Sequence, residues 1–386
     1  MFALLSAARN RLNRLGLLAV LPVLAACDPG ATLTQSLPNR AARVDVALLV
    51  PAGTPDGGAE LAASFENAAR LAAADLNGVE VTLRLYDTAG QAGQAAAVAQ
   101  AAVNDGADII LGPLFGDSAV AAGAAVAGDG VNVMAFSNNP TVAGGNVFIL
   151  GSTFQSSADR LVGYAAATGR SNVLIVQGDN AAEASGTEAI SRAIANQGAR
   201  LAGVSVFPLS QEGVINAIPT IADEARATGA DVLFMTSGND GAVPFLADLL
   251  PENGIDPTAI QFAGLQRLDV PASALSLGGL QGAWFALPDP GLAGQFQARY
   301  QATYGTLPHP LASLAYDGVA AIGALAGTDG LSAAAITRPN GFAGVNGIFR
   351  FLPGGTNERG LAVAQIQNQQ VVVIDPAPRS FGAAGL

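Results

Sequence analysis

The most constraining feature of this sequence is a repeated alternation of short apolar runs with longer alanine-rich stretches, which begins at Val44. Val46 to Val50 is an uninterrupted apolar run that ends at Pro51, as expected for a strand buried on both faces. Between Leu61 and Leu76 the apolar residues recur at helical spacing. Strands that alternate with helices predict a parallel sheet covered by helices on both faces.

The same rhythm runs along most of the chain and restarts once. In the first part we predict further strands at 79–86, 108–111 and 131–136, with helices at 91–103 and 118–126. In the second part we predict strands at 172–177, 201–207, 231–236 and 260–263, with helices at 184–196, 214–226 and 243–249. In the remainder we predict strands at 282–287, 347–351, 361–366 and 371–374, with helices at 292–304 and 312–326. The fold class is therefore α/β, with two doubly wound parallel-sheet lobes joined by a hinge of several strands.

The N-terminal segment has the pattern of an export signal. Three arginines precede an apolar run from Leu15 to Leu24, which is too short to span a bilayer comfortably. Leu24-Ala25-Ala26-Cys27 resembles the bacterial lipobox, in which the cysteine is lipid-modified after cleavage. We therefore predict a lipoprotein signal peptide at 1–26, a flexible tether at 27–43 and a lipid anchor on Cys27 in the periplasm, with the choice of membrane left open. We place lobe 1 at 44–151 plus 288–335 and lobe 2 at 152–287 plus 336–386.

Composition excludes several classes of function. The chain of 386 residues has a formal net charge of −12 and contains no lysine, so a nucleotide-binding P-loop is impossible and a basic nucleic-acid surface is not expected. It has one cysteine and one histidine, too few for an ordinary zinc site or an internal disulfide. His309 lies between two prolines, and no nucleophile motif accompanies it. We predict a protein that is not an enzyme and uses no cofactor or metal.

Several phrases resemble the type 1 periplasmic-binding fold, in its branched-chain amino-acid binding branch. They are Val46 to Pro51, Asp105 to Pro113, and Tyr316-Asp317-Gly318-Val319. Within that fold, further phrases are similar to bacterial lipoproteins called penicillin-binding protein activators. These are Val133 to Asn139, Gly341 to Phe351, Arg359 to Val363, and Asp375 to Pro378.

The resemblance implies a ligand cleft between the lobes, because ligands of open α/β sheets lie outside the carboxyl ends of the strands. The loops at those ends carry polar groups suited to a small ligand, and backbone amides at a helix start could bind a carboxylate. The same residue types are also ordinary helix caps and turn formers. The candidate ligand-binding residues are Leu114, Ser118, Ser137, Asn138, Asn139, Ser237, Asn239, Asp240 and Gln266. Asp317 is expected to stabilise the junction between the lobes.

The resemblance implies two alternative functions. The first is binding of a small polar ligand, amino-acid-like or peptide-like, for delivery to the permease of an ABC importer. The second is binding and stimulation of a peptidoglycan synthase. The chain departs from amino-acid binders in the second lobe, where Glu183-Ala184-Ser185-Gly186 replaces a Tyr-Gly pair. Asp240 is the remaining candidate to hold an ammonium group.

Overall fold

The computed structural model describes residues 42–55, 57–328 and 330–382. Its first sheet contains five strands in the order β2-β1-β3-β4-β5, all parallel. The strands are β1 (Ala42–Val50), β2 (Val79–Asp87), β3 (Ile109–Leu111), β4 (Val133–Ala135) and β5 (Val147–Ile149). The helices between them are α1 (Gly58–Asp75), α2 (Ala92–Asn104) and α3 (Gly116–Val126), with short 3-10 turns at η1 (Ala127–Asp129) and η2 (Pro140–Val142).

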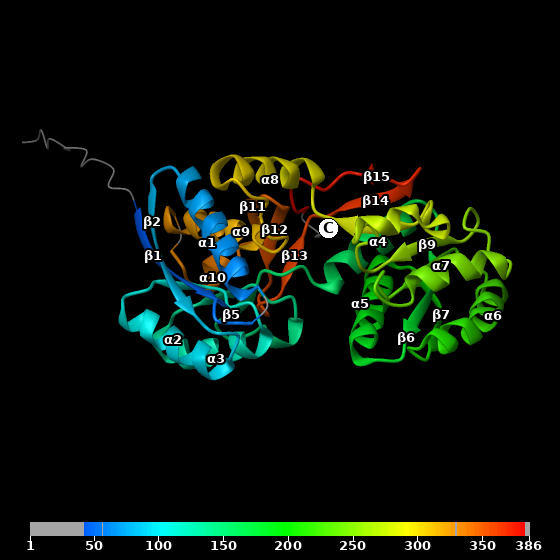
Figure 1. The fold of residues 1–386 in the computed structure, drawn as a ribbon, viewed down its shortest axis with the longest axis horizontal. Helices are drawn as coiled ribbons and strands as arrows, with labels where there is room; N and C mark the ends of the chain where they lie inside the picture. The colour runs from blue at the N-terminus through cyan, green and yellow to red at the C-terminus, as the bar shows by residue number, and fades with distance from the viewer. Residues whose placement is uncertain (1–41, 56, 329, 383–386) are drawn as a thin grey trace, which may run out of the picture. The chain divides into compact units, whose positions relative to one another are not determined.

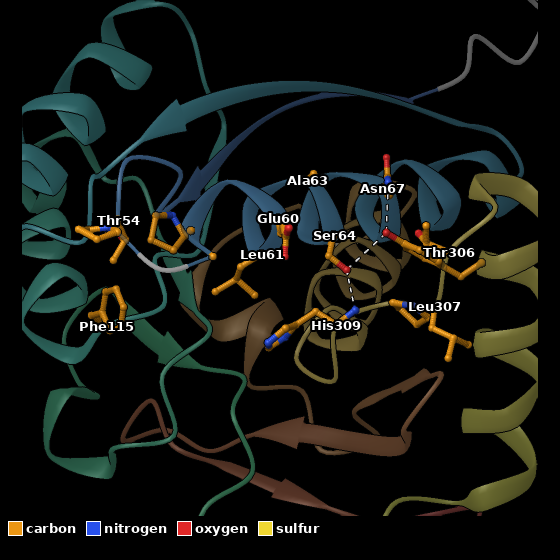
Figure 2. Close-up of a pocket in the computed structure, with 16 residues that line it drawn as sticks. Thr54, Glu60, Leu61, Ala63, Ser64, Asn67, Phe115, Thr306, Leu307 and His309 are labelled. Carbon is orange, nitrogen blue, oxygen red and sulfur yellow. Dashed lines mark hydrogen bonds between the residues drawn. The ribbon is translucent and has the colours of Figure 1, made fainter.

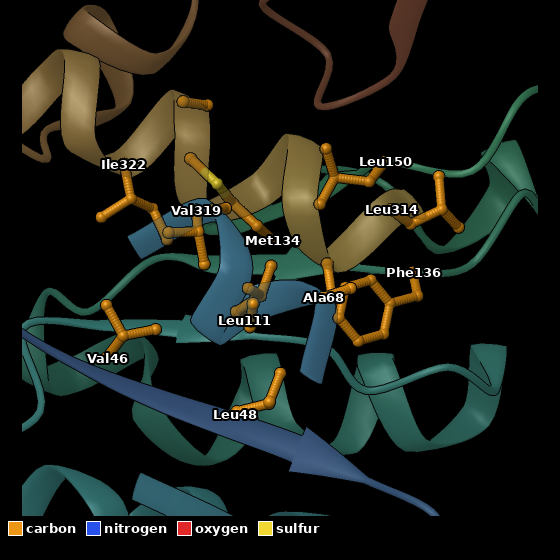
Figure 3. Packing of buried hydrophobic residues seen from close by; sticks show 14 of the residues in the cluster. Val46, Leu48, Ala68, Leu111, Met134, Phe136, Leu150, Leu314, Val319 and Ile322 are labelled. Carbon is orange, nitrogen blue, oxygen red and sulfur yellow. The ribbon is translucent and has the colours of Figure 1, made fainter. Parts of the chain in front are cut away.

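Alternation along β1 divides its side chains between two layers of core. Val46 and Leu48 face α1 and α9 (Ser313–Ala326), where they pack with Ala68 and Val319 (Figure 3). Ala47 faces the opposite layer, formed by α2 and α3. The apolar run therefore needs no polar face, because helices cover both sides of the sheet (Figure 1).

The second sheet contains seven strands in the order β15-β14-β10-β9-β8-β6-β7. Its parallel part is β6 (Asn172–Gly178), β7 (Arg200–Phe207), β8 (Val232–Met235), β9 (Gln261–Gly264) and β10 (Trp284–Leu287). The antiparallel strands β14 (Ala362–Gln367) and β15 (Gln370–Asp375) extend it at one edge. Helices α4 (Phe154–Ala167) and α5 (Ala181–Gln197) cover one face, and α6 (Gln211–Thr228) and α7 (Val243–Glu252) cover the other.

The last third of the chain completes both lobes, as the sequence predicted. Helix α8 (Pro290–Tyr304) and helix α9 pack in the first core, whereas β14 and β15 join the second sheet. Two short turns, η3 (Ala272–Ser276) and η4 (Gly278–Leu280), precede β10. The helix α10 (Ala333–Ile336) follows α9.

One predicted lobe boundary is wrong. We assigned all of 336–386 to the second lobe, but a three-stranded sheet within that range packs against the first core. It consists of β11 (Phe342–Gly344), β12 (Gly347–Phe351) and β13 (Asn357–Arg359). Phe351 stacks edge-to-face on Phe148 of β5, with ring centroids 5.8 Å apart. Aromatic burial against the first sheet therefore decides where this segment belongs.

The predicted signal peptide and Cys27, the predicted site of lipid modification, lie outside the described residues, as does most of the predicted tether. Within the described residues, no helix has the length and apolar character needed to cross a membrane.

Candidate functional site

The site is built on the loops that follow β3 and β4. β3 ends at Leu111, and Gly112 then adopts a φ of +90°, where a Cβ would lie 2.2 Å from the carbonyl oxygen of Leu49. Only glycine fits this close approach to β1. The turn brings Leu114 to the end of the sheet, where it packs partly against the first core.

The loop after β4 contributes the polar groups. Ser137 is 5% exposed, and its Oγ accepts a hydrogen bond from the backbone N of Asn139 at 3.2 Å. The side chain of Asn138 is exposed. Gly151, which follows β5, holds this loop from below, because its N donates to the carbonyl oxygen of Ser137 at 3.1 Å. The loop is therefore fixed by backbone contacts, while one amide side chain remains available to a ligand.

These loops surround a cavity of about 340 Å³ at the carboxyl ends of the first sheet. Leu114, Ser137 and Asn138 line it together with Asn346 and Arg359. The volume lies within the range of small-molecule sites, and apolar walls with a few polar groups are typical of them. Three of the nine predicted ligand-binding residues thus meet at one cavity.

A buried ion pair lies beneath this cavity. The Nη1 of Arg359, on β13, is 2.9 Å from Oδ2 of Asp317, on α9, and the two side chains are 3% and 0% exposed. Arg359 also donates from Nε and Nη2 to the carbonyl oxygen of Leu150, at 3.1 and 2.6 Å. Asp317 in turn accepts from the backbone N of Val345 and from Asn346. Asp317 therefore ties α9 to β13 and to the turn between β11 and β12, while Arg359 extends the network to Leu150; the role of Asp317 at the lobe junction stays a prediction.

Two other candidates on the first lobe have local partners or deep burial. Ser118 lies in the first turn of α3, where it is 1% exposed and its Oγ has no hydrogen-bond partner within the described residues. Asn139 caps the turn η2, because its Oδ1 accepts from the N of Thr141 at 3.0 Å. Neither residue lines the cavity of about 340 Å³.

In the second lobe, the hydroxyl of Ser237 donates a hydrogen bond to the carboxylate of Glu183, which is not among the predicted ligand-binding residues. Glu183, near the start of α5, is 9% exposed, and its carboxylate accepts from the hydroxyls of Thr236 and Ser237, each at 2.8 Å. The backbone N of Gly178 donates to the same carboxylate. Three donors thus stabilise this buried charge without a cation. An acidic residue in the first turn of a helix was the only signal in the sequence.

The remaining candidates follow β8 and β9 and do not line the cavity of about 340 Å³. Asn239 donates from Nδ2 to the carbonyl oxygens of Leu268 and Val270, at 2.8 and 3.0 Å. Gln266 donates to the carbonyl oxygen of Thr236 at 3.2 Å, and the side chain of Asp240 is exposed. Like the rest of the set, these residues stay predictions as ligand contacts. Within the described residues, no group of three His, Cys, Asp or Glu side chains could hold a metal ion.

A lobe with a parallel sheet, a lobe with a mostly parallel sheet, several connecting segments and a cavity at the strand ends define a two-lobed ligand-binding protein of the type 1 periplasmic-binding class. The chain belongs to the periplasmic binding protein family, whose model matches residues 43–370. No curated protein sequence matches it.

Solved structures share this fold. A putative branched-chain amino acid ABC transporter from Rhodospirillum rubrum aligns with a TM-score of 0.72 at 20% identity, over 86% of this chain and 100% of that one. A branched-chain amino acid ABC transporter periplasmic ligand-binding protein from Burkholderia xenovorans aligns with a TM-score of 0.65 at 18% identity, over 86% and 96%. An ABC transporter substrate-binding protein from Desulfitobacterium hafniense, in complex with Leu, aligns with a TM-score of 0.61 at 17% identity, over 86% and 100%.

Proposed function

We propose that this protein is a non-enzymatic periplasmic binding protein that holds a small polar ligand, amino-acid-like or peptide-like, and delivers it to the permease of an ABC importer. The observation that carries the proposal is the cavity of about 340 Å³ under Ser137 and Asn138, at the strand ends where open α/β sheets bind ligands. The fold relative from D. hafniense is described in complex with Leu, which supports an amino-acid-like ligand.

The polar groups of the cavity suit a ligand that both donates and accepts hydrogen bonds. The amide of Asn138 offers two donors and an acceptor oxygen, and Ser137 adds a hydroxyl. The guanidinium of Arg359 lines the same cavity, although Asp317 neutralises its charge. A compact polar molecule would gain specificity from these few groups and affinity from the apolar wall around Leu114 and Leu314.

A thermal-shift screen of the purified protein against amino acids and short peptides tests this function. We expect at least one compound to raise the melting temperature in a concentration-dependent way, because a ligand that binds only the folded state stabilises it. If no compound in a broad panel shifts the melting temperature, the proposal of solute binding fails.

We also propose that acyl chains on Cys27 hold the protein at the cell envelope. The lipobox-like residues Leu24 to Cys27 support this anchor, and each buried methylene adds about 0.8 kcal/mol of membrane affinity. Metabolic labelling with a fatty acid should mark the wild-type chain and leave Cys27→Ala unmarked. Equal labelling of both chains would contradict the anchor.

The alternative, a regulator that binds and stimulates a peptidoglycan synthase, rests on the sequence phrases that resemble penicillin-binding protein activators, among them Gly341 to Phe351. The hydroxyl of Ser237 donates to buried Glu183, so this group is not offered to a ligand. Co-purification of a membrane synthase with the intact protein, together with a negative ligand screen, would support this function and contradict solute delivery.

A further inference from the structure

A second cavity, of about 660 Å³, lies along α1 beside the loop that leads into α9 (Figure 2). Its walls come from the loop after β1, from α1 and from residues 306–309. No residue lines both cavities. Phe115 and His309 line the larger one, whereas their neighbours Leu114 and Pro310 line the smaller one, so two short segments separate the spaces.

His309 presents a hydrogen-bond donor to this second cavity. Its Nδ1 accepts from the backbone N of Leu311 at 3.2 Å, so the neutral ring carries its proton on Nε2. Partial desolvation lowers the pKa of His309 from its ordinary value of 6.5, which favours the neutral ring. Figure 2 shows the imidazole extending from the loop beneath α1 toward Leu61 and away from Leu307.

A chain of buried hydroxyls forms the wall next to His309. Asn67 donates from Nδ2 to the hydroxyl of Tyr300 at 3.1 Å, and that hydroxyl donates to Oγ of Ser64 at 3.4 Å. Ser64 Oγ also accepts from the backbone N of His309 at 2.8 Å. Ser64 and Tyr300 are 6% and 2% exposed. With two hydrogen bonds already accepted, the Ser64 oxygen has only its own hydrogen left to donate.

The opposite end of the cavity holds a polar atom that makes no hydrogen bond within the described residues. Thr54 Oγ1 is buried without a hydrogen-bond partner within the described residues. Two apolar side chains that line the cavity are exposed, with Phe115 at 41% beside Thr54 and Leu307 at 66% on the far side of His309 (Figure 2). Apolar side chains that line a cavity and stay exposed can pack against a ligand that enters it.

The charge of the lining selects against anions. Glu60, in the first turn of α1, is the only formally charged group among the described lining residues while His309 is neutral. Among the residues that the structure describes, no arginine lines the cavity. A carbonyl group can accept from His309 Nε2 and Ser64 Oγ, whereas an ammonium group can pair with the exposed carboxylate of Glu60.

We propose that the cavity of about 660 Å³ is a second binding site, for a short peptide or peptide amide with a free amino group and no carboxylate near His309. The ligand's carbonyl oxygens accept from His309 and Ser64, and its amino group faces Glu60. This site goes beyond the proposed solute-binding function and does not depend on the smaller cavity being occupied.

The single histidine of the chain gives a direct test by NMR. Histidine-selective ¹⁵N labelling of the full chain, without added histidines, yields the imidazole signals of His309 alone. Titration with the dipeptide amide Ala-Ala-NH₂ should shift the Nε2 signal in a saturable way. N-acetyl-Ala-Ala, which lacks the ammonium group and carries a carboxylate, should bind at least about tenfold more weakly. A signal that does not move with the amide, or moves equally with both compounds, overturns the proposal.

Variants separate this site from the smaller cavity. Glu60→Gln should weaken the dipeptide amide by about tenfold, and Ser64→Ala by about fivefold, because each removes one hydrogen-bonding partner. Glu212→Gln, which removes an exposed carboxylate from the first turn of α6, is the matched control and should bind like the wild type. Ser137→Ala should leave the titration unchanged. If Ser137→Ala abolishes the shift while Glu60→Gln does not change it, the peptide binds in the smaller cavity and the second site is refuted.

Discussion

At the residue scale, the ion pair of Arg359 and Asp317 removes two charged groups from water beside the candidate site. Both side chains are almost fully buried, and the guanidinium also donates two hydrogen bonds to the carbonyl oxygen of Leu150. Desolvation of two charges is repaid only when the remaining donors and acceptors are satisfied. The backbone N of Val345 and the amide of Asn346 satisfy Asp317 in this way.

Removing Arg359 should therefore destabilise the protein strongly. Arg359→Ala leaves the carboxylate of Asp317 buried without its cation, and we expect the free energy of unfolding to fall by about 3–5 kcal/mol in urea titrations. The double variant Arg359→Met/Asp317→Leu should recover part of that loss. Arg226→Ala breaks an exposed pair with Asp223 and should cost less than about 1 kcal/mol. Equal losses for the buried and exposed pairs would show that burial does not set the cost.

The surface carboxylate of Asp75 should contribute a small, pH-dependent stability. Its hydrogen bond from Arg299 is the main reason that the pKa of Asp75 lies below its ordinary value of 3.8, and Tyr316 donates to it as well. Because the folded-state pKa is depressed, the contribution is present above pH 3.8 and is lost as pH falls through the lower folded value.

Asp75→Asn should lower the free energy of unfolding by less than about 1 kcal/mol near neutral pH, since the group is exposed. The difference from wild type should shrink as urea titrations are repeated at lower pH, below about pH 4. A difference that stays constant or grows in acid would show that Asp75 does not act through its charge.

At the scale of elements, the rhythm of apolar runs was enough to predict most strands and helices of both lobes. The run at Val46 to Val50 predicts β1 because helices cover both faces of its sheet. The apolar rhythm did not reveal β5 and α4. β5 has only three residues, and pairing with β4 defines it. In α4 the signal was present, since Ala158, Leu161, Val162 and Ala165 follow helical spacing, but polar residues fill its first turn.

The candidate site could be predicted only where its residues lie next to strand ends in sequence. Leu114, Ser137 and Asn138 follow β3 and β4, and the topology of a parallel sheet brings such loops together. Arg359 reaches the same cavity from β13, more than 200 residues after Asn138 in the chain, and the phrase Arg359 to Val363 indicates a family resemblance without indicating a cavity residue. The burial of Glu183 could not be predicted, because the hydroxyls that stabilise its carboxylate belong to Thr236 and Ser237, more than 50 residues further along the chain.

Gly151, which follows β5, packs closely against the loop that contains Ser137 and Asn138, and it is therefore sensitive to substitution. A Cβ at Gly151 would lie 2.6 Å from the carbonyl oxygen of Ser137 and 2.7 Å from the N of Asn138, both backbone atoms. Gly151→Ala should therefore displace the loop and weaken ligand affinity by about tenfold or more, measured by calorimetry. Gly128→Ala, where a Cβ would meet nothing within 4 Å, is the control and should bind normally. If Gly151→Ala binds the ligand with wild-type affinity, the loop that contains Ser137 and Asn138 does not form part of the ligand site.

At the scale of the whole molecule, three segments connect the two lobes. They follow β5, β10 and β13, and the first and third are joined by hydrogen bonds. Asn357 donates from Nδ2 to the carbonyl oxygens of Ile149 and Gly151, at 2.7 and 2.8 Å, and Arg359 binds Leu150 between them. Side chains of β13 thus hold the segment that follows β5. In proteins that close around a ligand, the affinity falls by the fraction of molecules that are not competent to bind.

The most direct test is the affinity of wild type and of Ser137→Ala/Asn138→Ala for the amino acid or peptide that gives the largest thermal shift, measured by titration calorimetry. We predict a saturable binding event at the cavity of about 340 Å³ in the wild type, and in the double variant a loss at this site of roughly 1 kcal/mol for each deleted hydrogen bond, which is about a tenfold to thirtyfold weaker affinity. Unchanged affinity in the double variant would contradict a ligand site at the strand ends of the first lobe.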